Sequence, residues 1–151
     1  MHTSTQPMDW SDSLLVGHAG MDCEHQAFMH CVNAMLTAGD AHFSEALQAM
    51  AEHLAEHFAL EERLIDEHRF PAGACHAEEH AKVRASVREV QALVAAGDIE
   101  IGRELAQALI DWFPGHAEQM DSALATWVAR KTLGGAPVVL RRDLRALAPS
   151  A

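Results

Sequence analysis

Basic residues are scarce in this sequence of 151 residues. Eleven lysines and arginines stand against 22 aspartates and glutamates, so the formal net charge is -11 at pH 7. A general nucleic-acid-binding protein needs a basic face that neutralises phosphates. We therefore expect no nucleic-acid partner.

Long apolar runs and an export signal are also missing. No stretch approaches the roughly 18 consecutive apolar residues of a membrane-spanning helix, and the first ten residues have neither a basic start nor an apolar run. Cysteine occurs only three times, at Cys23, Cys31 and Cys75, and an odd number without an export signal argues against a disulfide framework. We expect a cytoplasmic protein with free thiols and no membrane partner.

Tyrosine is absent, whereas histidine occurs eleven times. Histidine is the commonest transition-metal ligand among the side chains, so this enrichment favours a metal site without locating it. A length of 151 residues with 49% hydrophobic content suits one compact domain.

Four segments have helical composition and spacing, at about residues 20–38, 42–68, 75–96 and 99–131. Short turn signals separate them, and two of these are Gly-Asp pairs. Asp40 and Asp98 in these pairs are expected to cap the helices that follow them. Helices of this length joined by short turns predict an all-α, antiparallel up-down-up-down four-helix bundle.

The bundle is expected to occupy residues 19–131, between an N-terminal arm (1–18) and a short basic tail (132–151). From Arg130 to the end of the chain, five basic residues stand against one acid. The tail is therefore the candidate segment for docking a protein partner, although a solvated chain end is the more ordinary interpretation.

Each predicted helix carries at least one side chain that can bind a metal. His57 and Glu61 are four residues apart on the second helix, and His76 and His80 are four apart on the third, so each pair projects from one helix face. The first helix contributes His25. The fourth contributes His116 and, five residues later, Asp121. Donors on facing helices are how a metal site is built in a bundle core.

This order and spacing, His25, then His57-Phe58-x-x-Glu61-Glu62, then His76-x-x-x-His80, then His116-x-x-x-x-Asp121, resembles the hemerythrin signature in its bacterial form. The similarity extends over about residues 10 to 130, and Trp10, Gly17, Asp22, Asn33, Pro71 and Trp112 add to it.

The resemblance implies two iron ions joined by a bridging oxo or hydroxo group. One iron would be held by His76, His80 and His116, and the other by His25 and His57. Glu61 and Asp121 would bridge them. Five imidazoles and two carboxylates suit iron and leave one ion with an open position. The implied function is reversible dioxygen binding for storage or delivery, without enzymatic turnover.

Two other functions stay open under the same resemblance. One is sensing of oxygen, redox state or nitric oxide through a partner, and the other is a di-iron redox enzyme that turns over peroxide or nitric oxide. A ferritin-like di-iron carboxylate site is disfavoured because it needs Glu-x-x-His motifs on two helices, and the sequence contains none.

The fourth helix departs from a regular pattern. Pro114 is expected to kink or interrupt it, since proline removes a backbone donor and clashes with the preceding turn. His116 and Asp121, five residues apart, would lie about 140° apart on a regular α-helix. A local distortion is needed to turn both side chains inward.

Several residues beside the predicted ligands have expected roles. Glu24 stands where the family commonly has glutamine and is expected to point off the core face. His53, one turn from His57, is the one nearby group that could deliver a proton near neutral pH. Apolar residues near the ligands are candidates for an oxygen pocket, although each is equally compatible with ordinary core packing. These are Phe28, Phe58, Leu64, Trp112 and Phe113.

Overall fold

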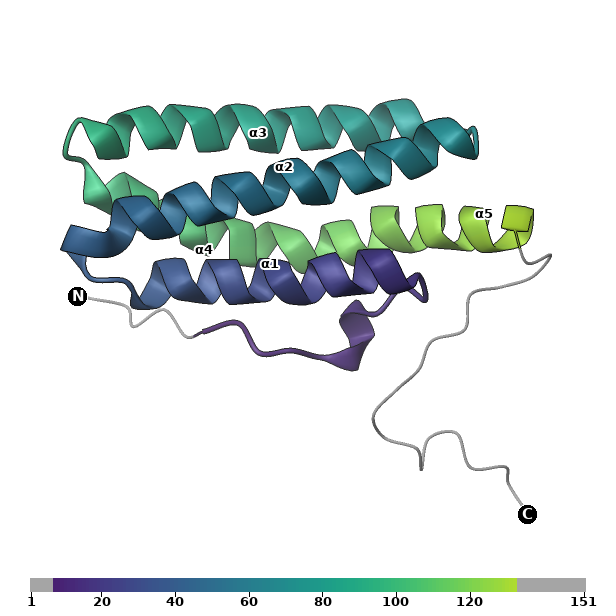
Figure 1. The fold of residues 1–151 in the computed structure, drawn as a ribbon, viewed down its shortest axis with the longest axis horizontal. Coiled ribbons are helices and arrows are strands. Elements are labelled where there is room, and N and C mark those ends of the chain that lie inside the picture. Colours follow the sequence, from purple (N-terminus) through teal and green to yellow (C-terminus); the bar gives the residue numbers. More distant parts are fainter. Residues whose placement is uncertain (1–6, 133–151) are drawn as a thin grey trace, which may run out of the picture.

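The computed structural model describes residues 7–132 as four helical rods packed side by side (Figure 1). The rods run alternately in opposite directions, which confirms the predicted up-down-up-down bundle. The first three are α1 (Ala19–Thr37), α2 (Phe43–Glu67) and α3 (Gly73–Ala95). The fourth consists of α4 (Ile99–His116), the π-helical turn η3 (Ala117–Asp121) and α5 (Ser122–Thr132). The tail from residue 133, with its proposed docking role, lies outside the described residues.

The two Gly-Asp pairs behave differently. Asp98 caps α4 as predicted, because its Oδ1 accepts a hydrogen bond of 3.1 Å from the Ile101 amide. The predicted cap at Asp40 is wrong. The chain makes a 3-10 turn, η2 (Asp40–His42), before α2 begins, so Asp40 lies inside that turn and its carboxylate pairs with Arg103 at 2.6 Å.

The predicted irregularity of the fourth helix is present but displaced. Pro114 lies inside α4, and the α-helical pattern continues to His116. It then gives way to the five-residue π-helical turn, after which α5 continues the rod. A π turn inserts one residue into an α-helix and is often found at functional sites.

The N-terminal arm is tied to α1 by polar contacts. The Asp22 carboxylate accepts hydrogen bonds from the amides of Val16 (2.7 Å) and Gly17 (3.2 Å). Asn33 pairs with both the amide and the carbonyl of Met8. These contacts hold a short 3-10 turn, η1 (Asp12–Leu14), against the bundle.

Two apolar clusters form the core, one on each side of a layer of buried polar side chains. The larger cluster includes Phe28, Met35, Phe43, Met50, Phe58, Leu109 and Phe113. The smaller includes Val16, Met21, Leu64, Ile65, Leu124 and Val128. The polar layer is therefore enclosed by apolar side chains along the bundle axis.

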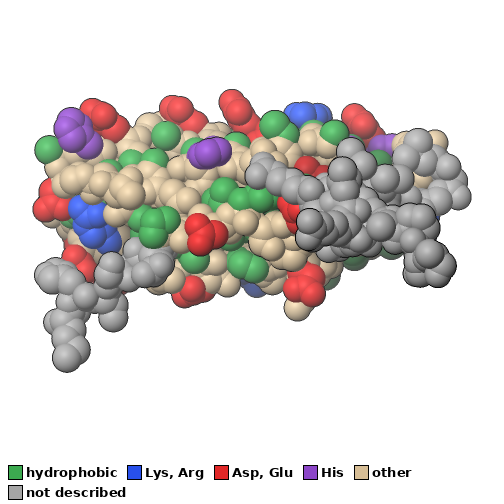
Figure 2. Space-filling model, turned by 90° about the horizontal axis from the view of Figure 1, so that it is seen from below, with side chains coloured by type: hydrophobic (Ala, Val, Ile, Leu, Met, Phe, Trp, Pro, Cys, Tyr) green, Lys and Arg blue, Asp and Glu red, His purple; other side chains and the backbone are tan. Residues whose placement is uncertain are grey.

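The surface is mainly acidic, as the net charge of the sequence indicates. Acidic side chains are scattered over the face shown in Figure 2, with few basic ones between them. All three cysteines are free, as predicted. Among the described residues, no helix is both long and apolar enough to cross a membrane.

Candidate metal centre

All seven predicted ligand residues lie in the buried polar layer. Each is at most 3% exposed, although histidine, aspartate and glutamate are ordinarily surface residues. They come from every rod of the bundle, and the seven are His25 on α1, His57 and Glu61 on α2, His76 and His80 on α3, and His116 and Asp121 at the ends of the π turn.

The seven residues form two overlapping groups that share both carboxylates. The first contains three histidines with Glu61 and Asp121, and the second contains His25 and His57 with the same two carboxylates. Within each group the candidate ligand atoms lie within 4.8 Å of one another. This arrangement matches the division into three and two histidines that the sequence resemblance implied.

The Glu61 carboxylate shows the sharing directly. Its Oε2 lies 2.7 Å from His57 Nε2, and its Oε1 lies 3.1 Å from His76 Nε2 and 3.2 Å from His80 Nε2. One oxygen thus faces each group. This is the geometry required of a bridging carboxylate.

The spacing of these atoms fits metal ligands better than a self-contained polar cluster. With ligand bonds of about 2.1 Å, neighbouring ligands of one ion lie about 3 Å apart. Asp121 Oδ1 lies 3.0 Å from the Nε2 atoms of both His76 and His116, but neither contact has the angles of a hydrogen bond. A buried, unbonded carboxylate oxygen is costly unless a cation meets it.

The π turn explains how His116 and Asp121 come together. A π-helical turn is closed by contacts between residues five apart, so these two side chains share a face that a regular α-helix would not give them. His116 Nε2 lies 3.0 Å from Asp121 Oδ1 as a result. The distortion required by the sequence spacing is therefore this turn.

In the absence of metal, protons balance the two carboxylates. Burial alone would lower the pKa of His25 and of His116, but contacts with Asp121 and Glu61 outweigh it and raise both pKa values to about 10. Burial would raise the pKa of Asp121, yet its contacts with His116 and His25 lower it to about 2. The pKa of Glu61 is also lowered, against the effect of its burial, by the surrounding histidines.

Three of the five imidazoles have a partner for the nitrogen that faces away from the cluster. His25 Nδ1 lies 3.1 Å from the Leu14 carbonyl, which the N-terminal arm supplies. His116 Nδ1 lies 3.0 Å from Glu79 Oε1, and His57 Nδ1 lies 3.3 Å from His53 Nε2. Such outer contacts fix the ring and tautomer of a metal-binding histidine.

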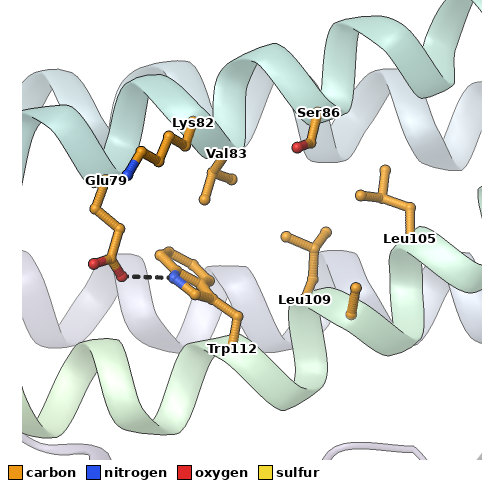
Figure 3. Close-up of a pocket in the computed structure, with 8 residues that line it drawn as sticks. Glu79, Lys82, Val83, Ser86, Leu105, Leu109 and Trp112 are labelled. Atoms are coloured by element: carbon orange, nitrogen blue, oxygen red, sulfur yellow. Dashed lines mark hydrogen bonds between the residues drawn. The ribbon is translucent and has the colours of Figure 1, made fainter.

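Glu79 joins the centre to a groove between α3 and α4. Its Oε1 accepts a hydrogen bond of 2.7 Å from Trp112 Nε1 (Figure 3). The same oxygen also contacts His116 Nδ1. The groove has a volume of about 470 Å³ and is lined mainly by apolar side chains, among them Val83 and Leu109. Trp112 stacks on His116 with ring centroids 4.4 Å apart, so the indole separates the groove from the centre.

Two aromatic residues predicted for an oxygen pocket contact the three-histidine group. Phe58 stacks on His80, with ring centroids 3.9 Å apart, and Trp112 stacks on His116. Both shield imidazoles from water. Their role toward a ligand stays a prediction.

The other three pocket candidates are divided between the apolar clusters. Phe113 meets His25 edge-on, with ring centroids 5.1 Å apart, and Phe28 stacks on the Phe113 ring at 4.2 Å. Leu64 belongs to the smaller cluster with Met21, on the other side of the polar layer. The four aromatic candidates form one connected cluster, with neighbouring ring centroids 4.2 to 6.4 Å apart, whereas Leu64 lies apart from them.

The sequence did not predict which residues contact the imidazole nitrogens that face away from the cluster. Glu79 directly precedes His80, and nothing in the spacing shows that it reaches across to His116 on another rod. Glu24 was expected to point off the core face, but its Oε2 lies 3.5 Å from His53 Nδ1. His53 is buried behind His57, where burial and the nearby His57 and His25 lower its pKa to about 4.

Comparison with known proteins agrees with this geometry. A family model described as the hemerythrin HHE cation binding domain matches residues 16–128. A bacteriohemerythrin of Ralstonia nicotianae is 39% identical over 124 residues, covering 82% of this chain and 90% of that protein. A bacteriohemerythrin of Stenotrophomonas maltophilia is 28% identical, covering 79% and 80%, and a myohemerythrin of Riftia pachyptila is 24% identical, covering 76% and 88%.

Proposed function

Since this chain belongs to the hemerythrin family, we propose that it binds dioxygen reversibly at a pair of iron ions, as an oxygen store or carrier. The observation that carries the proposal is the buried set of five imidazoles and two carboxylates, arranged as two groups that share the carboxylates. In this proposal His76, His80 and His116 hold one ion, and His25 and His57 hold the other.

The uneven division of histidines supports ligand binding at one ion. Three imidazoles and two shared carboxylates would hold the first ion, whereas the second would have one protein ligand fewer. When bound, an iron pair of this kind supplies an open coordination position and two readily exchanged electrons, which is the chemistry that reversible dioxygen binding needs.

The protein excludes water and protons from this position. The ligand residues are almost completely buried, and Phe113 packs edge-on against His25 while Phe28 stacks on Phe113. A dry, apolar environment slows the proton transfers that turn a carrier into an oxidase.

His53 was the one nearby residue expected to supply a proton, and its position supports the proposal that the protein is an oxygen carrier. It contacts the outer nitrogen of His57 rather than the side of that ring that faces the cluster. Its pKa of about 4, lowered first by burial, leaves it uncharged at neutral pH. His53 is therefore a poor acid under working conditions.

An anaerobic titration separates a carrier from an enzyme. We expect the reduced, iron-loaded protein to take up one dioxygen per iron pair, followed by visible absorption, and to release it when oxygen is removed. The control is a sample that was never loaded with iron. Sustained oxygen consumption in the presence of excess reductant would replace the carrier with a di-iron oxidase.

A further inference from the structure

A chain of three polar side chains leads away from the two-histidine group toward the surface. His53 lies one helical turn before His57 on α2 and is 8% exposed. Its Nε2 lies 3.3 Å from His57 Nδ1, and its Nδ1 lies 3.5 Å from Glu24 Oε2 on α1. The Glu24 side chain is 26% exposed, so the chain ends at water.

Which nitrogen donates in the contacts between His57, His53 and Glu24 depends on the His57 atom that faces the metal. His57 Nε2 points at Glu61 and the cluster, at 2.7 Å, so a metal ion would bind there and the ring proton would lie on Nδ1. That N–H then donates to His53 Nε2. A neutral His53 with an acceptor at Nε2 carries its own proton on Nδ1, which faces the Glu24 carboxylate.

We propose, on the basis of the proposed function, that Glu24 and His53 form a positioning relay that orients His57 and strengthens Nε2 as an iron ligand. A negative charge beyond two successive N–H groups increases the electron density at the metal-facing nitrogen. Within residues 7–132, the contact behind the other histidine of this group, His25, is the uncharged Leu14 carbonyl. The relay therefore acts on one of the two imidazoles at the ion with the open position.

Metal affinity tests the relay without relying on oxygen binding. We expect His53→Leu to weaken iron(II) at the two-histidine site by about 10- to 100-fold, as is typical when an outer partner is removed, and Glu24→Gln to weaken it several-fold. Competition with a chelator gives these affinities. The matched control is Glu56→Gln, which removes the same charge from an exposed residue lining the same surface groove as Glu24.

Coupling between the two positions distinguishes a relay from general loss of packing. Adding Glu24→Gln to His53→Leu should cause no further loss of affinity, because the link to His57 is already broken. His53→Gln should recover part of the affinity, since its amide oxygen can accept from His57 Nδ1. If His53→Leu does not fold, Glu24→Gln and His53→Gln still give the comparison with Glu56→Gln.

The tautomers of His57 and His53 give a second test of the relay, because packing alone would not determine them. In the zinc-loaded, nitrogen-15-labelled protein, NMR should find His57 and His53 both protonated on Nδ1. A His53 protonated on Nε2, or a Glu24→Gln affinity equal to that of Glu56→Gln, would overturn the relay. A wild-type protein that holds two irons and binds dioxygen while these variants match it contradicts the relay alone, whereas failure of the wild type to hold two irons contradicts the proposed function.

Discussion

Replacing Glu61 by alanine is expected to abolish binding of both iron ions. Its two oxygens face the two groups separately, one near His57 and the other near His76 and His80, so the substitution removes a ligand from each ion at once. It also leaves a cavity among the buried imidazoles of the cluster. Loss of a single terminal imidazole, as in His25→Ala, removes a ligand from one ion only. It should therefore cause a smaller loss of bound iron.

Asp121→Ala should have the same effect as Glu61→Ala, since Asp121 is shared by the same groups. The measurement is iron per folded chain after anaerobic loading, with circular dichroism to confirm that the helices remain. Glu118→Ala is the matched control for Asp121, because Glu118 lies in the same π turn and is exposed. Retention of both irons and of reversible oxygen binding by either bridging variant would show that its residue is no bridge.

Iron binding should release protons and become tighter as pH rises. His25 and His116, with pKa values of about 10 in the metal-free protein, each hold a proton near neutral pH, and each must lose it to bind metal through Nε2. The apparent affinity of the pair is therefore expected to rise up to about 100-fold per pH unit between pH 7 and 9, one factor of ten for each proton. Calorimetry in buffers of different ionisation enthalpy counts these protons directly.

The same two histidines set how the stability of the metal-free protein depends on pH. Their pKa values are higher in the folded than in the unfolded chain, so they stabilise the fold fully below about pH 6.5 and lose that contribution as pH rises toward 10. The melting temperature of the metal-free protein should fall over this range. The iron-loaded protein, whose ligand nitrogens carry no proton, should not follow it, and parallel curves for the two forms would contradict the assignment of His25 and His116 as ligands.

The sequence predicted the helices well, and it singled out the seven polar residues that the fold buries together, because both depend on local spacing. Apolar periodicity and the Gly-Asp turns located every end of the four rods to within two residues. Pairs four apart, such as His76 and His80, must share a helix face whatever surrounds them. The buried layer then follows from turning those faces inward.

What the sequence did not predict depends on contacts between rods. The cap at Asp40 failed because Arg103, 63 residues away, offers its carboxylate another partner. Glu79 and Glu24 each directly precede a ligand histidine, and their contacts with His116 and His53 arise only when neighbouring helices pack. The spacing of His116 and Asp121 called for a distortion, but the sequence alone did not show that it would be a π-helical turn that begins after His116.

Iron content is the measurement that tests the central claim most directly. Elemental analysis of the purified protein, loaded with iron(II) under anaerobic conditions and freed of excess metal, should give two irons per chain, because two groups of ligands share two carboxylates. A single zinc per chain, or no retained iron, would contradict the di-iron centre and with it the proposed function.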